Sequence, residues 1–134
     1  SRRGTGKDLF VTQAVWESSV ARIGKDAVEL FEGGIFILFA EPVPDALAEV
    51  SLVHHGPSRE FAPIEAGDEL CIGETCLAIE EVGSRANENF RVLGHIVVYL
   101  NIGDGEILPG AVKATGPVPV PAVGDRIVIH RKEV

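Results

Sequence analysis

The sequence predicts a mostly β domain, a small closed or partly open, largely antiparallel β-barrel with one or two short helices. Three observations support this fold class. Short apolar segments bounded by Gly, Pro or Asp outnumber helical patterns, and several of them follow one another directly. The 15 Gly and 8 Pro are spread along all 134 residues rather than collected in a linker. We therefore expect one domain over residues 11–134, preceded by a flexible segment over residues 1–10.

Eight segments carry the strand signal, because each is rich in Val, Ile, Leu or Phe and is bounded by turn-forming residues. They cover residues 13–20, 34–40, 50–54, 69–72, 75–82, 96–100, 111–114 and 125–130. Residues 25–31 and 86–92 have the spacing of short helices, the second with Ser84 or Asn87 available as a cap. Residues 44–49 are expected to add one further helical turn.

One hairpin is specified closely by its residues. Gly73 and Glu74 lie between two apolar arms, which is typical of a two-residue turn. In that register Cys71 and Cys76 face each other directly, near enough for a cross-strand disulfide. We expect two reduced, packed thiols in a reducing cytosol instead. Two cysteines without a matching His pair make a poor zinc site.

Charge and hydropathy restrict the class of partner. The formal net charge is −8, and it falls to −11 without Arg2, Arg3 and Lys7. Such a body repels nucleic acids and anionic membranes and attracts partners with a basic patch. No apolar run approaches the ~20 residues of a membrane span, and residues 1–7 are not followed by the apolar stretch of a secretory signal. We expect a cytoplasmic protein without metal or cofactor.

Histidine is the residue type most capable of chemistry in this chain. His54 and His55 end an apolar strand just before a Gly-Pro-Ser turn, so one is expected to point inward and the other outward. A neutral imidazole is a competent nucleophile near pH 7 and can accept a phosphoryl group. By itself, such a pair at a strand end is more often a surface turn than a catalytic site. Candidates to contact the transferred phosphoryl oxygens are Ser51, Gly56, Ser58 and Arg59.

Four stretches, in order from about residue 12 to 130, resemble the glucitol/sorbitol-specific IIA component of the bacterial phosphoenolpyruvate-dependent sugar phosphotransferase system. They are Val-Ala-Arg-Ile-Gly at 20–24, Leu-Val-His-His-Gly at 52–56, Val-Gly-Ser at 82–84 with Asn-Phe-Arg-Val-Leu-Gly-His at 89–95, and Pro-Gly at 109–110 with Gly-Pro-Val-Pro at 116–119. The third stretch is the most specific. The resemblance covers nearly the whole chain.

This resemblance implies a phosphohistidine carrier. Such a carrier takes its phosphoryl group from the histidine-containing phosphocarrier protein and passes it to the cognate IIB domain of the sugar permease. Alignment from the preceding strand places His54 at the phosphorylated position, with linkage through Nε2. Alignment back from Gly56 places His55 at the second histidine of the family motif, so His55 is the alternative. His95 is a possible auxiliary group, and His130 is expected to be structural.

Two further readings stay open. A non-catalytic β-barrel binding or regulatory module would contain the same strands, with the His pair acting only as a turn. An exposed strand edge would also allow a homodimer.

Overall fold

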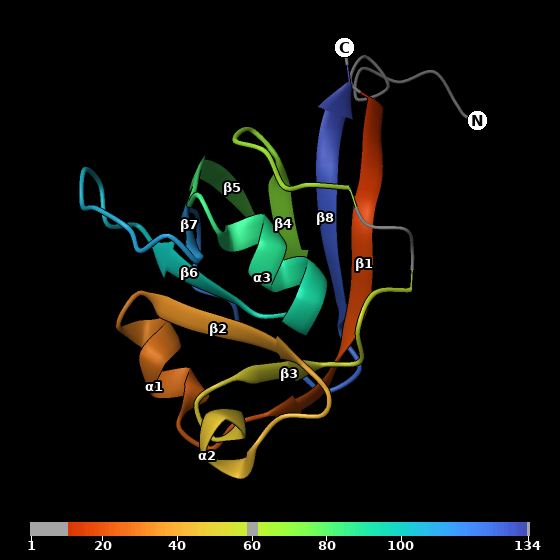
Figure 1. Cartoon of the computed structure of the whole chain (residues 1–134), viewed down its shortest axis with the longest axis vertical. Helices are drawn as coiled ribbons and strands as arrows, with labels where there is room; N and C mark the ends of the chain where they lie inside the picture. Colours follow the sequence, from red (N-terminus) through yellow and green to blue (C-terminus); the bar gives the residue numbers. More distant parts are fainter. Residues whose placement is uncertain (1–10, 59–61, 134) are drawn as a thin grey trace.

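The computed structural model describes residues 11–58 and 62–133. These residues form a closed eight-stranded barrel with three short helices, which confirms the predicted class (Figure 1). The elements are β1 Val11–Ile23, α1 Ala27–Glu32, β2 Ile35–Ala40, α2 Asp45–Ala48, β3 Leu52–His54, β4 Glu69–Ile72, β5 Thr75–Val82, α3 Ala86–Leu93, β6 Ile96–Leu100, β7 Ala111–Thr115 and β8 Arg126–Glu133. The N-terminal segment expected to be flexible lies outside the described residues.

Strand order around the barrel is β1-β3-β2-β6-β7-β5-β4-β8, and β8 pairs again with β1. Most neighbouring strands are antiparallel, as expected, but β3 runs parallel to β2 and β7 runs parallel to β6. In Figure 1 the long strands β1 and β8 run side by side. Every strand of the described barrel has a partner on both sides. The homodimer that the sequence left open stays a prediction.

Side chains from the inner faces of the strands fill the barrel, and helix α3 adds buried side chains to this core. Helix α3 contributes Ala86 and Phe90, both buried. Phe90 lies against Trp16 of β1, with 4.6 Å between ring centroids. On β5 the inward-facing Leu77 and Ile79 alternate with exposed residues, which is the period-2 pattern of a half-buried strand. This packing places the C-terminal end of α3 beside the end of β3.

The predicted 71–76 hairpin has the expected register, with Cys71 opposite Cys76 and Ile72 opposite Thr75. Gly73 takes a positive φ of 60° in the turn. Contrary to the expected reduced thiols, Cys71 and Cys76 form a disulfide. The reason is geometric, because directly opposed strand positions bring the two Cα atoms to 4.0 Å. The carboxylate of Glu69 lies close to both sulfurs, so these three residues could in principle surround a metal ion. Sulfurs joined in a disulfide are not available as thiolate ligands, however.

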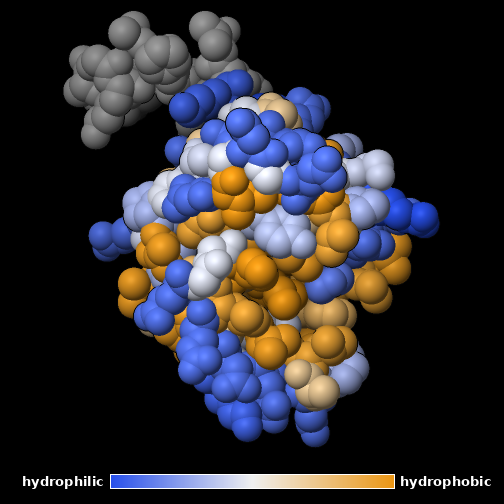
Figure 2. All heavy atoms as spheres, turned by 90° about the vertical axis from the view of Figure 1, so that its left-hand side faces the viewer, coloured by the Kyte–Doolittle hydropathy of each residue, from blue (hydrophilic) through white to orange (hydrophobic). Residues whose placement is uncertain are grey.

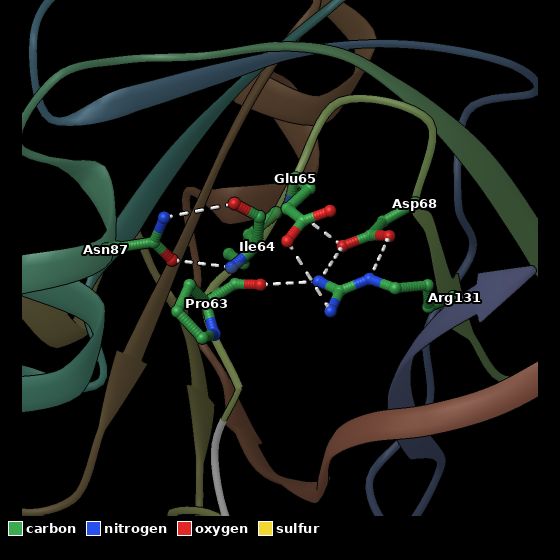
Figure 3. A network of polar contacts seen from close by, with 6 residues as sticks. All are labelled: Pro63, Ile64, Glu65, Asp68, Asn87 and Arg131. Carbon is green, nitrogen blue, oxygen red and sulfur yellow. Dashed lines mark hydrogen bonds and ion pairs between the residues drawn. The ribbon is translucent and has the colours of Figure 1, made fainter.

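Helix α3 is not capped as predicted. Its N-cap is Arg85 without a side-chain cap, and Asn87 instead forms two hydrogen bonds with the backbone of Ile64. The Asn87 Oδ1 accepts from the Ile64 N–H at 2.7 Å, and its Nδ2 donates to the Ile64 carbonyl at 3.0 Å (Figure 3). Arg131 of β8 donates to the carbonyl of Pro63 and to the carboxylate of Asp68. These contacts fix the segment before β4 between α3 and β8.

Candidate functional site

Strand β3 places the two adjacent histidines at its C-terminal end. It lies between β1 and β2, with His54 opposite Val20 of β1 and beside Ala40 of β2. All three residues of β3 are buried. The strand ends at His54, and Gly56 follows with a positive φ of 94° that favours glycine. A buried strand, paired on both sides, therefore sets the position of His54.

His54 lies inside the barrel, and its side chain is 0% exposed. The Trp16 ring and the imidazole are nearly perpendicular, with 5.1 Å between ring centroids and an interplanar angle of 80°. The ring of Phe90 on α3 lies 6.4 Å from the imidazole. Aromatic walls of this kind exclude water from the ring and favour its neutral form.

Both ring nitrogens of His54 have polar partners. Nε2 lies 2.8 Å from the carbonyl oxygen of Gly94. The backbone N–H of Gly56 donates to Nδ1 at 3.1 Å, and the Ser18 hydroxyl lies 3.2 Å from the same atom. A carbonyl only accepts, so the contact with Gly94 places a proton on Nε2, and the Gly56 contact leaves Nδ1 as the acceptor. The described arrangement is thus the Nε2–H tautomer.

Burial lowers the pKa of His54 below its ordinary value. The Gly94 carbonyl opposes this shift by accepting from the ring, the neighbouring His55 lowers the pKa further, and the Glu41 carboxylate raises it. Desolvation is the largest of these causes. His54 is therefore held neutral, which is the state a nitrogen nucleophile requires.

His55 has the opposite environment. Its side chain is 57% exposed, as the alternation along the strand predicted. Nδ1 lies 2.9 Å from Oε1 of Glu41, and the backbone N–H of His55 donates to the Ser19 carbonyl at 3.1 Å. No residue in the described ranges pairs with Nε2 of His55. The carboxylate thus orients the ring with Nε2 directed away from it.

Gly94 closes the site over His54 from the end of α3. It is the C-cap of the helix, in the left-handed conformation with φ of 63°. A Cβ at this position would lie 2.3 Å from the Cβ of Ala40 and 3.1 Å from Cε1 of His54. Only glycine fits this close approach. Gly94 was not predicted to belong to the site, although its place directly before His95 in the most specific stretch was a usable signal.

A surface hollow of about 390 Å³ lies above this closure. Residues 39–42, Pro57 and residues 90–94 line it. His54 is not part of the lining, but three lining residues adjoin it: Gly94, Phe90 and Ala40. The Gly94 carbonyl is the group of this lining that contacts Nε2.

The remaining residues expected at the site are directed elsewhere. His95 Nδ1 lies 3.3 Å from the Leu38 carbonyl, its ring packs on Phe39 at 4.5 Å, and no contact of His95 with His54 occurs among the described residues. The Ser51 hydroxyl donates to the Leu47 carbonyl, and the Ser58 hydroxyl donates to the carbonyl of Glu17. Of the expected phosphate contacts only Gly56 reaches His54, and Arg59 lies outside the described residues.

His130, expected to be structural, lies on β8 opposite Glu69 of β4 and Ala14 of β1. Its Nδ1 is buried without a hydrogen-bond partner among the described residues. The site also includes Ser18, which was not predicted from the sequence. Ser18 belongs to β1, 36 residues before His54, and it meets the histidine through strand pairing rather than through a local motif.

A second hollow, of about 420 Å³, lies away from the histidines. Helix α1 and residues 118–121 line it. Apolar side chains gather on the face of the molecule that includes α1, as Figure 2 shows. No helix in the described part of the chain is long and apolar enough to cross a membrane.

The chain is similar to known proteins of one family. The family model described as the PTS system glucitol/sorbitol-specific IIA component matches residues 15–128. Glucitol/sorbitol-specific EIIA components of Escherichia coli (strain K12) and Shigella flexneri are each 29% identical over 106 residues, covering 78% of this chain and 85% of theirs. The crystal structure of a PTS system IIA component from Enterococcus faecalis V583 is similar with a TM-score of 0.71 and 28% identity, covering 83% of this chain and 96% of that one. The chain therefore belongs to the glucitol/sorbitol-specific IIA components of the phosphotransferase system.

Proposed function

We propose that this IIA component is a phosphohistidine carrier in the uptake and phosphorylation of a glucitol- or sorbitol-type sugar. It accepts a phosphoryl group from the histidine-containing phosphocarrier protein and passes it to the cognate IIB domain of the membrane permease. His54 is the acceptor. The observation that carries this proposal is a neutral imidazole at the end of a rigid strand, one layer beneath a surface hollow.

Transfer to His54 takes place at Nε2, the nitrogen that contacts Gly94 of the hollow's lining. The bond between phosphorus and the donor imidazole breaks as the bond between phosphorus and Nε2 forms, and the electron pair of the broken bond stays on the donor nitrogen. This exchange needs in-line approach and charge stabilisation rather than a metal or cofactor. Nε2 must present a lone pair, so its proton and the Gly94 carbonyl both have to leave before attack.

The negative charge of the chain suits a cytoplasmic partner with a positive surface. The formal net charge of −8 favours association with a basic patch and disfavours nucleic acid. The hollow beside Gly94 is bordered by residues of two elements, the end of β2 and the end of α3, so a docked partner would touch both sides of the closure.

His55 is the second candidate acceptor, and one observation favours it. Its ring is exposed, Glu41 holds Nδ1, and Nε2 has no partner among the described residues. Acceptance there would require no opening. We retain His54 because the aliphatic strand leads directly into it and because its low pKa keeps the ring neutral.

The test is phosphorylation by phosphoenolpyruvate and the general phosphotransferase proteins, followed by mass spectrometry under conditions that preserve phosphohistidine. His54→Gln and His55→Gln are compared with the unaltered chain, because both histidines lie in one short peptide. We expect an acid-labile adduct on the unaltered chain and on His55→Gln, and none on His54→Gln. An adduct that survives in His54→Gln and disappears in His55→Gln would transfer the role to His55. Absence of any adduct with an active donor would refute the carrier function.

A further inference from the structure

The Ser18 hydroxyl contacts both Nδ1 of His54 and the carbonyl of Gly56. Ser18 is 5% exposed on β1. Its Oγ donates to the carbonyl of Gly56 at 2.7 Å and lies 3.2 Å from Nδ1 of His54. The backbone N–H of Gly56 lies 3.1 Å from the same Nδ1. One buried nitrogen therefore faces two groups that compete for it.

Counting protons shows that these contacts cannot all be hydrogen bonds at once. The serine hydroxyl has one proton, and the short contact with the Gly56 carbonyl uses it, because a carbonyl cannot donate. Toward Nδ1 the serine oxygen thus offers only a lone pair. The Gly56 N–H, in contrast, needs a lone pair on Nδ1. Gly56 therefore favours the Nε2–H tautomer, and Ser18 favours a proton on Nδ1.

We propose that Ser18 is a positioning residue that stabilises the Nδ1–H tautomer of His54, the form whose Nε2 lone pair can accept a phosphoryl group. The proposal rests on the carrier function proposed above. In this form Nδ1 donates to Ser18 Oγ, and Ser18 continues to donate to the Gly56 carbonyl. After attack, Nδ1 keeps its proton and continues to donate it to Ser18 Oγ, while Nε2 carries the phosphoryl group.

The same tautomer change acts on the closure formed by Gly94. With the proton on Nδ1, the Nε2 lone pair would face the Gly94 carbonyl oxygen at 2.8 Å, and two acceptors at this distance repel each other. Gly94 is the C-cap residue that follows the last residue of α3, so its carbonyl can turn without unwinding the helix. Its departure uncovers Nε2 toward the hollow. Ser18 thus connects the protonation of one ring nitrogen with access to the other.

The test compares Ser18→Ala with Ser18→Thr, which restores a hydroxyl, and with Ser19→Ala as the matched control. Ser19 is the next residue of β1, and its side chain points to the other face of the strand. The rate of phosphoryl acceptance is measured per folded molecule, and ¹⁵N NMR of the imidazole reports which nitrogen carries the proton. Unfolding in urea gives the stability of each variant.

We expect Ser18→Ala to accept the phosphoryl group about 10- to 100-fold more slowly, which corresponds to loss of one buried hydrogen bond. Its phosphorylated form should lose the Nδ1–H signal, Ser18→Thr should recover most of the rate, and Ser19→Ala should match the unaltered chain. If Ser18→Ala is less stable but reacts at the normal rate with an unchanged Nδ1 signal, the proposal is overturned. Absence of phosphorylation on His54 of the unaltered chain would instead refute the proposed function itself.

Discussion

His54 and His55 are neighbours in the sequence but occupy opposite environments. One is enclosed by Trp16, Phe90 and backbone groups, whereas the other is exposed and paired with Glu41. The enclosed ring has a lowered pKa and no accessible lone pair, and the exposed ring has an accessible nitrogen but no surrounding cradle. Of these two adjacent side chains, His54 is held in a fixed environment but is not accessible, whereas His55 is accessible but is not held in such an environment. A carrier based on His54 must add access, and one based on His55 must add charge stabilisation.

The largest effect should come from removing the enclosed imidazole. We expect His54→Gln to reduce the rate of phosphoryl acceptance at least about 1,000-fold, because the nucleophile itself is lost. His55→Gln should change the same rate less than about 5-fold, since it removes only an exposed side chain. Stopped reactions with a labelled donor measure both rates. Equal losses in the two variants would mean that the histidines act as a unit, and the contrast between them would be wrong.

The closure over His54 can be tested by adding one methyl group to Gly94. Gly94 and Gly103 share a φ of 63°, but a Cβ at Gly94 meets Ala40 and His54, whereas at Gly103 nothing lies within 4 Å. We expect Gly94→Ala to lower the free energy of unfolding by about 3 kcal/mol, from backbone strain plus overpacking. Gly103→Ala should cost only about 1 kcal/mol, from the backbone alone. Urea unfolding checks both, and equal costs would exclude a close-packed closure.

Acid should destabilise the protein through the enclosed histidine. Burial lowers the pKa of His54 in the folded state, so below pH 6.5 the unfolded chain binds a proton that the folded chain resists. Stability contributed by this group is therefore present above pH 6.5 and is lost as pH falls toward the lowered folded pKa. The loss is at most about 1.4 kcal/mol per pH unit. Urea unfolding at pH 7.5 and 5.5 should show a smaller acid loss in His54→Gln, and an identical loss would contradict the neutral assignment.

The exposed pair should contribute least to stability. Glu41→Gln removes the carboxylate that holds His55, and exposed ion pairs contribute little because water and salt screen them. We expect a change in the free energy of unfolding below about 0.5 kcal/mol. A change above 1 kcal/mol in the same urea assay would show that Glu41 has a structural role beyond this contact.

Local patterns were sufficient to predict the strands, the three helical segments and the 71–76 hairpin. Period-2 alternation and turn residues act within a few positions, so they can be read along the chain. The parallel pairings of β2 with β3 and of β6 with β7 were not predicted, because alternation indicates a strand without identifying its partner. The disulfide depended on redox state as well as register, and there the prediction was wrong.

The candidate site was predicted only where its residues are consecutive. The opposite orientation of His54 and His55 followed from strand geometry, and Gly56 was included because it adjoins them. Ser18 and Gly94 lie 36 and 40 residues from His54, and only the folded barrel brings them to its ring. Ser51 was included by proximity in sequence, but its hydroxyl is held by the Leu47 carbonyl.

The pairing of β1 with β8 has a consequence for how this protein is made. The strand formed early in the chain completes the barrel only with the last one, through contacts such as Glu17 with Arg126, which are 109 residues apart. A nascent chain that lacks β8 would leave one side of both β1 and β4 unpaired. Closure must therefore follow emergence of β8 from the ribosome, and until then the unpaired sides of β1 and β4 are open to mispairing.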